Sequence, residues 1–173
     1  MGNFSITSET VFAHPAERVY DFVSNPGNWG RTYKGSGGMH EGSKHLKLPL
    51  QIGDTWMEKV DLPPNTYHSE WTLITARRPT KFVFQQINKV GVNADGSGGV
   101  EGITTISYTF EPNIGHGMTL FTRNLTTELP KGVDIPDDLL TVCCRPGGID
   151  RYHAAIEKEL DAEFGKPKDA FKE

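Results

Sequence analysis

A series of strand patterns followed by one long helical pattern restricts the fold of this chain more than any other feature. Between Ile103 and Phe110 the residues alternate between two faces, one of which carries Tyr108 and Phe110. After residue 148 the apolar residues recur at intervals of three and four, which is typical of a helix that is apolar on one side. That helical pattern comprises Ile149, Tyr152, His153, Ile156, Leu160 and Phe164.

Further strands are expected at residues 4–12, 55–60, 67–75, 82–87 and 118–125, between turns rich in Gly, Pro and Asn. Pro15 opens a helix after the first strand, residues 25–28 end it, and Trp29 follows in a turn or a second short helix. Consecutive strands joined by short turns form an antiparallel meander. We therefore predict one domain over residues 1–173, an α+β fold in which a curved antiparallel sheet of about six to seven strands wraps around the C-terminal helix.

A strongly curved sheet around a helix seldom closes at its centre, so an internal cavity is expected. Segments 34–45 and 91–101 are rich in glycine and are interpreted as flexible loops. One or two helical turns are expected at 137–144, and residues 145–148, Arg-Pro-Gly-Gly, are expected to interrupt the helix. We predict that the cavity mouth lies between these two loops and residues 143–148; alternatively, all three are ordinary surface segments at different ends of the molecule.

Composition and charge exclude several classes of partner. The formal net charge is -4, the sequence pI is about 5.9, and the Lys and Arg residues are scattered. This balance disfavours a nucleic acid or an anionic membrane as the partner. The sequence contains no long apolar run of the kind that spans a membrane, and its first residues lack the pattern of a signal peptide, so a cytoplasmic location is expected.

No motif indicates a metal or another cofactor. His40 and His45 are five residues apart with Gly42 between them, so they do not share a helical face as zinc ligands would. The glycine runs at 35–38 and 96–99 lack the strand, helix and lysine of a phosphate-binding loop. Adjacent Cys143 and Cys144 are interpreted as unpaired thiols.

Four stretches occur in a recognisable order. Residues 11–29 combine a strand end, a proline-led helix and a tryptophan turn, and residues 50–56 form a glycine turn before a strand. Residues 71–84 form a strand, proline turn and strand, and residues 105–112 form a strand before a glycine-rich hairpin. This set resembles the START-related, polyketide-cyclase-like superfamily, which includes the birch-pollen-allergen-like proteins. The resemblance implies a helix-grip fold, but no catalytic residue, because the superfamily has no universal catalytic motif.

The face of each strand that carries aromatic residues is expected to point inward. Glu58 shares that face with Trp56 and is expected to be a polar group inside; alternatively, Glu58, His68, Glu70 and Arg123 point to solvent from the convex face. With Phe82 as a further aromatic neighbour, the predicted ligand-binding residues are Trp56, Trp71, Phe84, Tyr108, Phe110, Tyr152 and Ile156.

Three functions are compatible with this pattern. The first is a carrier or sensor that binds a small hydrophobic or aromatic molecule in the cavity. The second is a cyclase or dehydratase in which Glu58, His68, Tyr108 or His153 moves protons. His153 and Glu58 are the predicted catalytic residues, although a histidine on the apolar side of a helix is also typical of a satisfied core residue. The third is a protein-binding module of the chaperone-activator type, which requires an exposed apolar patch.

Overall fold

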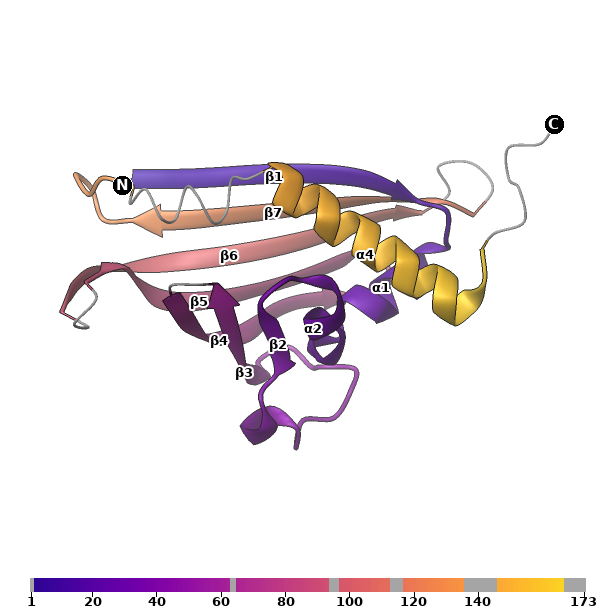
Figure 1. Cartoon of the computed structure of the whole chain (residues 1–173), viewed down its shortest axis with the longest axis horizontal. Coiled ribbons are helices and arrows are strands. Elements are labelled where there is room, and N and C mark those ends of the chain that lie inside the picture. Colours follow the sequence, from indigo (N-terminus) through magenta and orange to yellow (C-terminus); the bar gives the residue numbers. More distant parts are fainter. Residues whose placement is uncertain (1, 63–64, 94–96, 113–116, 136–145, 167–173) are drawn as a thin grey trace.

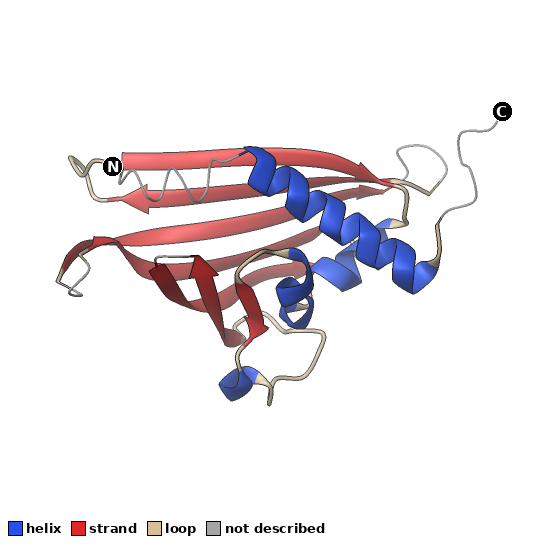
Figure 2. Cartoon of the chain, viewed as in Figure 1, coloured by secondary structure: helices blue, strands red, loops and turns tan. Residues whose placement is uncertain are grey.

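The computed structural model describes residues 2–62, 65–93, 97–112, 117–135 and 146–166. Seven strands form one antiparallel sheet in the order β1-β7-β6-β5-β4-β3-β2, and the helices lie on one face of it (Figures 1 and 2). The strands are β1 (Gly2–Phe12), β2 (Ser36–Met39), β3 (Thr55–Leu62), β4 (Asn65–Arg77), β5 (Lys81–Val92), β6 (Gly98–Pro112) and β7 (Thr119–Leu129). The helices are α1 (Ala16–Val23), η1 (Pro26–Asn28), α2 (Trp29–Thr32), η2 (Glu41–Ser43) and α4 (Pro146–Phe164).

The predicted α+β architecture is confirmed. The last helix, α4, crosses the sheet from β1 toward α1 (Figure 1). From β2 to β7, each strand lies next to the strand that follows it in the sequence. Only the first strand is out of sequence order, because β1 pairs with β7 along its whole length. This pairing brings the first and the last strands together, so the N-terminal residues help to form the surface that α4 covers.

Burial alternates along the central strands in the way the sequence predicted. In β6, Tyr108 and Phe110 are buried whereas Ser107 and Thr109 are half-buried, which places the aromatic residues on the inner, helix-facing side. The same face of β3 carries Trp56 and Glu58, both buried. The aromatic face is therefore the inner face, and Glu58 lies on it rather than in solvent.

Aromatic side chains fill the inner face beneath α1 and α2. The side chain of Trp29 is held against the end of α1, because its indole Nε1 donates a hydrogen bond to the carbonyl oxygen of Val23, at 2.9 Å. Its ring packs against Trp56 and Phe84, with ring centres 5.8 and 5.0 Å away. Phe84 also contacts Trp71 edge to face at 4.9 Å. Large aromatic side chains in mutual contact leave this end of the interior densely packed.

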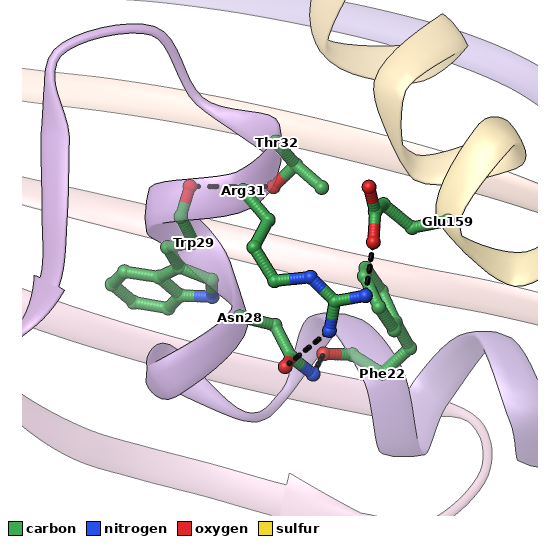
Figure 3. Close-up of polar contacts among 6 residues, drawn as sticks. All are labelled: Phe22, Asn28, Trp29, Arg31, Thr32 and Glu159. Carbon is green, nitrogen blue, oxygen red and sulfur yellow. Dashed lines mark hydrogen bonds and ion pairs between the residues drawn. The ribbon is translucent and has the colours of Figure 1, made fainter. Parts of the chain in front are cut away.

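One arginine links the short helices to α4 (Figure 3). The guanidinium of Arg31 forms an ion pair with Glu159 and donates to Asn28 Oδ1 at 3.3 Å. It also lies over the ring of Phe22, with its central carbon 5.5 Å from the ring centre. Asn28 Nδ2 in turn donates to the Phe22 carbonyl at 2.9 Å. These contacts fix α1 and α2 against the middle of α4.

The interpretation of residues 34–45 as a flexible loop is wrong. This segment forms strand β2 at one edge of the sheet and the turn of helix η2. Its glycines permit close packing: a Cβ on Gly38, whose φ is +67°, would lie 3.3 Å from the Pro26 carbonyl oxygen. A Cβ on Gly30 would lie 3.2 Å from the Ser36 carbonyl oxygen. Glycine is needed here because backbones approach one another, which composition alone does not distinguish from flexibility.

The other two glycine-rich segments also belong largely to regular elements. Strand β5 continues to Val92 and β6 begins at Gly98, so most of segment 91–101 is part of a hairpin. Helix α4 begins at Pro146, so residues 146–148 open the helix rather than interrupt it; proline suits a first turn because its missing N–H has no partner there. Residues 137–144, with both cysteines, lie outside the described residues, and the position of a cavity mouth stays a prediction.

Candidate functional site

Two tyrosines meet between the centre of the sheet and α4. The hydroxyl oxygens of Tyr108, on β6, and Tyr152, on α4, lie 3.2 Å apart. Arg123 on β7 stands directly opposite Tyr108 in the strand pairing, on the same inner face as Phe121 and Leu125. Its guanidinium interacts with the Tyr108 hydroxyl, and its central carbon lies 5.9 Å from the centre of the Tyr152 ring. Three elements thus bring a cation and two phenols together.

Burial controls the charge of these phenols. It raises the pKa of Tyr108, and it raises the pKa of Tyr152 well above its ordinary value. The positive charge of Arg123 acts in the opposite direction on both groups, but it is the smaller effect. Both side chains are therefore neutral hydrogen-bonding groups rather than phenolates.

Glu58 lies inside the sheet, 6% exposed, at the β3 side of this site. Its carboxyl group accepts hydrogen bonds from Trp71 Nε1, at 2.9 Å, and from the hydroxyl of Ser36. Burial raises the pKa of Glu58, and the two hydrogen bonds only partly offset this effect. Glu58 therefore keeps its proton to higher pH than an exposed glutamate does.

His153 follows Tyr152 on α4 and faces the sheet, with 8% of its surface exposed. Its ring packs edge to face against Phe121 and Phe12, with ring centres 5.8 and 6.4 Å away. Its Nε2 atom is buried and has no hydrogen-bond partner among the described residues. Burial lowers the pKa of His153, and the positive charge of Arg123 lowers it further. The ring is therefore a neutral imidazole held in apolar surroundings.

The inner face is less tightly closed around Arg123 than beneath α1. Arg123 is half-buried, and so are Ile6 and Ser8 on the neighbouring strand β1. Ser8 pairs directly with Arg123, and the Ser8 hydroxyl is buried with no hydrogen-bond partner in the described part of the chain. Two of the three buried side-chain polar atoms that have no hydrogen-bond partner among the described residues, Ser8 Oγ and His153 Nε2, therefore lie near Arg123, whereas the third, Trp56 Nε1, lies in the aromatic cluster beneath α1 and α2.

The structure separates the predicted site residues into two groups. Tyr108, Tyr152 and His153 lie near the arginine, and Glu58, to which Trp71 is hydrogen-bonded, interacts electrostatically with the two tyrosines. The others are deeply buried side chains of the core: Trp56, Phe84, Phe110 and Ile156. Whether any of these residues contacts a ligand stays a prediction.

His68 and Glu70, which the sequence offered as candidates, lie outside the site, whereas Arg123 lies inside it without having been predicted as a site residue. His68 and Glu70 are exposed on the outer face of β4, so the suggestion that His68 moves protons inside is wrong. Arg123 appeared in the sequence only as one ionisable strand residue among several. Its position between the buried residues Phe121 and Leu125, two residues away on either side, was the signal that placed it inside. Ser8 and Ser36 gave no comparable signal.

A surface pocket of about 340 Å³ lies on the far side of α1, near the end of α4. One pair of opposite charges there is matched: Arg78 donates two hydrogen bonds to Asp21, at 2.7 and 2.8 Å. Arg18 lies over the ring of Phe164, 4.7 Å from its centre. A pocket lined by charged side chains, some of which already bind one another, does not favour an apolar ligand. This pocket is therefore a weaker candidate than the site around Arg123.

Within the described ranges, no three His, Cys, Asp or Glu side chains come together in a group that could hold a metal ion. Among the helices of those ranges, none is both long enough and apolar enough to cross a membrane.

No protein-family model matches the chain, and no curated protein sequence matches it either. Solved structures do. The chain superposes on the crystal structure of Ara h 8.0201 with a TM-score of 0.65 and 11% identity, covering 93% of this chain and 99% of that chain. A START superfamily protein from Mycobacterium smegmatis also gives a TM-score of 0.65, at 11% identity, covering 94% and 99% of the two chains. The chain has the helix-grip fold.

The same helix-grip fold occurs in the di-domain ARO/CYC StfQ from the steffimycin biosynthetic pathway. That comparison gives a TM-score of 0.66 at 10% identity and covers 95% of this chain but 52% of StfQ, so the chain spans about half of that protein. The resemblance first inferred from the sequence is thus confirmed as a resemblance of fold. Similarity at 10–11% identity establishes no shared function.

Proposed function

We propose that this helix-grip chain binds a small hydrophobic or aromatic molecule between the inner face of its sheet and α4. The observation that carries the proposal is the coincidence of two features at one place. Half-buried inner side chains, Ile6, Ser8 and Arg123, lie beside aromatic walls made by Phe121 and Tyr152. Ligand sites in proteins are lined mainly by apolar and aromatic side chains with a few polar groups that orient the ligand.

The shared fold supports the proposal. One protein with this fold is described as a START superfamily protein and another as the di-domain ARO/CYC StfQ from the steffimycin biosynthetic pathway. The cytoplasmic location expected from the sequence agrees with a carrier or sensor of small molecules. No resident metal or other cofactor is part of this proposal.

Native mass spectrometry of the full chain after incubation with a mixture of hydrophobic metabolites tests the proposal. A bound species of defined mass is expected, together with a rise in Tm, because a ligand that binds only the folded state stabilises it. Ser8→Phe should abolish both effects, because the new ring occupies the inner face next to Arg123. Thr7→Phe places the same ring on the outer face of the same strand and is the matched control. Equal binding by both variants would place the ligand elsewhere.

A cyclase or dehydratase is the second candidate, favoured by the state of Glu58. A buried carboxyl group whose pKa is raised holds its proton to higher pH than an exposed one, and general acids in enzymes are tuned in this direction. Dehydration of a β-hydroxy ketone to the enone, followed by ultraviolet absorbance, distinguishes this candidate from a carrier. Catalysis that is lost in Glu58→Gln and kept in Glu70→Gln, an exposed residue on the adjacent strand, would support an enzyme. Binding without turnover would support a carrier.

A further inference from the structure

Arg123 is a positive charge without an opposing carboxylate. It is the one basic side chain that the described strands direct toward α4, and no Asp or Glu within those ranges forms an ion pair with it. The other ionisable strand residue on the inner face is Glu58, whose carboxyl group is already occupied by Trp71 and Ser36. The contacts of the Arg123 guanidinium are with the neutral Tyr108 hydroxyl and the Tyr152 ring, so the charge that burial has partly dehydrated is not neutralised, and this costs free energy.

Hydrogen-bond donors converge on the space beside this guanidinium. The hydroxyls of Tyr108 and Tyr152 lie next to it, and both are neutral because of burial. The Ser8 hydroxyl stands opposite Arg123 in the β1–β7 pairing and has no partner in the described chain. A guanidinium with neighbouring hydroxyls binds the two oxygens of a carboxylate through short, charge-assisted hydrogen bonds.

The surroundings of these donors are apolar. Phe12 and Phe121 pack around the adjacent ring of His153, and Leu125 follows Arg123 on the inner face of β7. The unpartnered Nε2 of His153 is a further buried polar atom close to this group. A ligand that accepts hydrogen bonds from these donors and also packs against the apolar side chains therefore combines an anionic group with a hydrophobic part.

We propose that the site selects small hydrophobic carboxylic acids, with the carboxylate of the ligand bound to Arg123 and to the one hydroxyl of the Tyr108–Tyr152 pair whose proton is not already donated to the other. This inference rests on the proposed binding function and deepens it, because it names the chemical class of the ligand. Arg123 is its specificity-determining residue. Neutral molecules of the same shape bind the same walls but leave the guanidinium unpaired.

Isothermal titration of the full chain with 2-naphthoate and with 2-naphthamide tests the proposal. The two probes have nearly the same shape and differ in charge at neutral pH. The acid should bind the wild-type chain about ten- to a hundredfold more tightly than the amide, because a hydrogen bond to a charged group contributes that much. Arg123→Gln should remove this preference and leave amide binding nearly unchanged. Arg77→Gln, which removes an exposed arginine from the end of β4, should keep the preference.

The outcomes separate this inference from the proposed function. Equal binding of acid and amide by the wild-type chain overturns the selection of carboxylates and leaves the binding function standing. A preference for the acid that survives in a folded Arg123→Gln variant overturns the role of Arg123. Failure of both probes to bind overturns both proposals for ligands of this size.

A third variant covers a failure of Arg123→Gln to fold, which circular dichroism would reveal. Arg123→Lys keeps the charge but cannot form the paired hydrogen bonds, so it should retain a part of the preference for the acid. In the wild-type chain the preference should also shrink as salt is added, because ions screen the attraction between the charges. A preference unaffected by both changes overturns the inference.

Discussion

The hydroxyl oxygens of Tyr108 and Tyr152 lie 3.2 Å apart and join the middle of the sheet to the last helix. A third tyrosine, Tyr33, packs edge to face against Tyr152, with ring centres 6.1 Å apart. Helix α4 is therefore held from the sheet below it and from the segment that follows α2. The same hydrogen bond fixes the two tyrosine hydroxyls beside Arg123. The stability of the helix and the geometry of the proposed site therefore depend on the same residues.

Tyr152→Phe should reduce the free energy of unfolding by about 1 kcal/mol, the usual net value of one buried hydrogen bond. The aromatic ring stays in place, so the loss measures the hydroxyl alone. Denaturant unfolding followed by fluorescence gives this value. Tyr20→Phe is the control, because Tyr20 is also buried but its hydroxyl has no hydrogen bond within the described residues. Equal losses in the two variants would mean that the contact between Tyr108 and Tyr152 does not hold the helix.

Phe84→Ala should cost about 3–5 kcal/mol, as is typical when a large aromatic side chain is removed from a core. Phe84 is 1% exposed and touches Trp29, Trp56 and Trp71, so its removal leaves a space that these rigid rings cannot fill. Ile87→Ala on the same strand is the control; Ile87 is 66% exposed and should change stability by less than about 0.5 kcal/mol. Denaturant unfolding of both variants measures the difference. A loss below about 1 kcal/mol in Phe84→Ala would contradict the dense packing described beneath α1 and α2.

The sequence predicted the order of elements well because most strands carry a clear alternation. In β6 the alternation from Ile103 to Phe110 identified both the strand and its inner face. Strand ends were predicted too short, since β5 runs from Lys81 to Val92 whereas its apolar pattern ends at Ile87. Hydrogen bonds to a neighbouring strand, which single-sequence periodicity does not contain, extend the strand beyond its buried part.

Strand β2 and the site around Arg123 were harder to predict for a common reason. The residues of β2 are Ser-Gly-Gly-Met, which carry no strand signal, and the strand exists because its glycines fit against η1 and α2. The meeting of Arg123 with Tyr152 joins β7 to α4, and only the packing of the helix on the sheet brings them together. Periodicity predicts on which face of the sheet a residue lies. It does not predict which residue of the covering helix that side chain contacts, because this depends on the tertiary structure.

Glu58 should make the chain less stable as the pH rises. Its pKa in the folded state is raised above the ordinary value of 4.5, so the folded state retains a proton that the unfolded state has released. The stabilising contribution is complete below about pH 4.5 and is lost as the pH rises through the raised pKa, with a slope of at most about 1.4 kcal/mol per pH unit.

Glu58→Gln should remove this slope, so the variant gains stability relative to the wild type as the pH rises. The amide oxygen can accept from Trp71 Nε1, and the amide nitrogen can donate to Ser36, so the local hydrogen bonds are kept. Denaturant unfolding at a series of pH values measures the difference. Glu70→Gln, on the exposed face of β4, should follow the wild type. A constant difference between Glu58→Gln and wild type would show that Glu58 does not titrate differently on folding.

His153 should give the opposite dependence on pH. Its pKa in the folded state is lowered by burial and by Arg123, so the unfolded state binds the proton more readily. The stability associated with the neutral ring is present above the ordinary pKa of 6.5 and is lost as the pH falls through the lowered value. Acid should therefore weaken the packing of α4 on β1 and β7, where the ring contacts Phe12 and Phe121.

His153→Phe should flatten this acid limb, because an uncharged ring takes the place of one that must stay unprotonated. The new ring fits the apolar contacts with Phe12 and Phe121 and removes the buried Nε2 that has no partner in the described chain. Unfolding free energies of the variant and of the wild type, measured between about pH 5 and 8 around the ordinary histidine pKa, should differ by a constant amount at high pH, and the difference should grow in favour of the variant toward low pH. His68→Gln, at an exposed position on β4, should follow the wild type. A difference between His153→Phe and the wild type that stays constant down to the lowest pH would mean that protonation of His153 does not oppose folding.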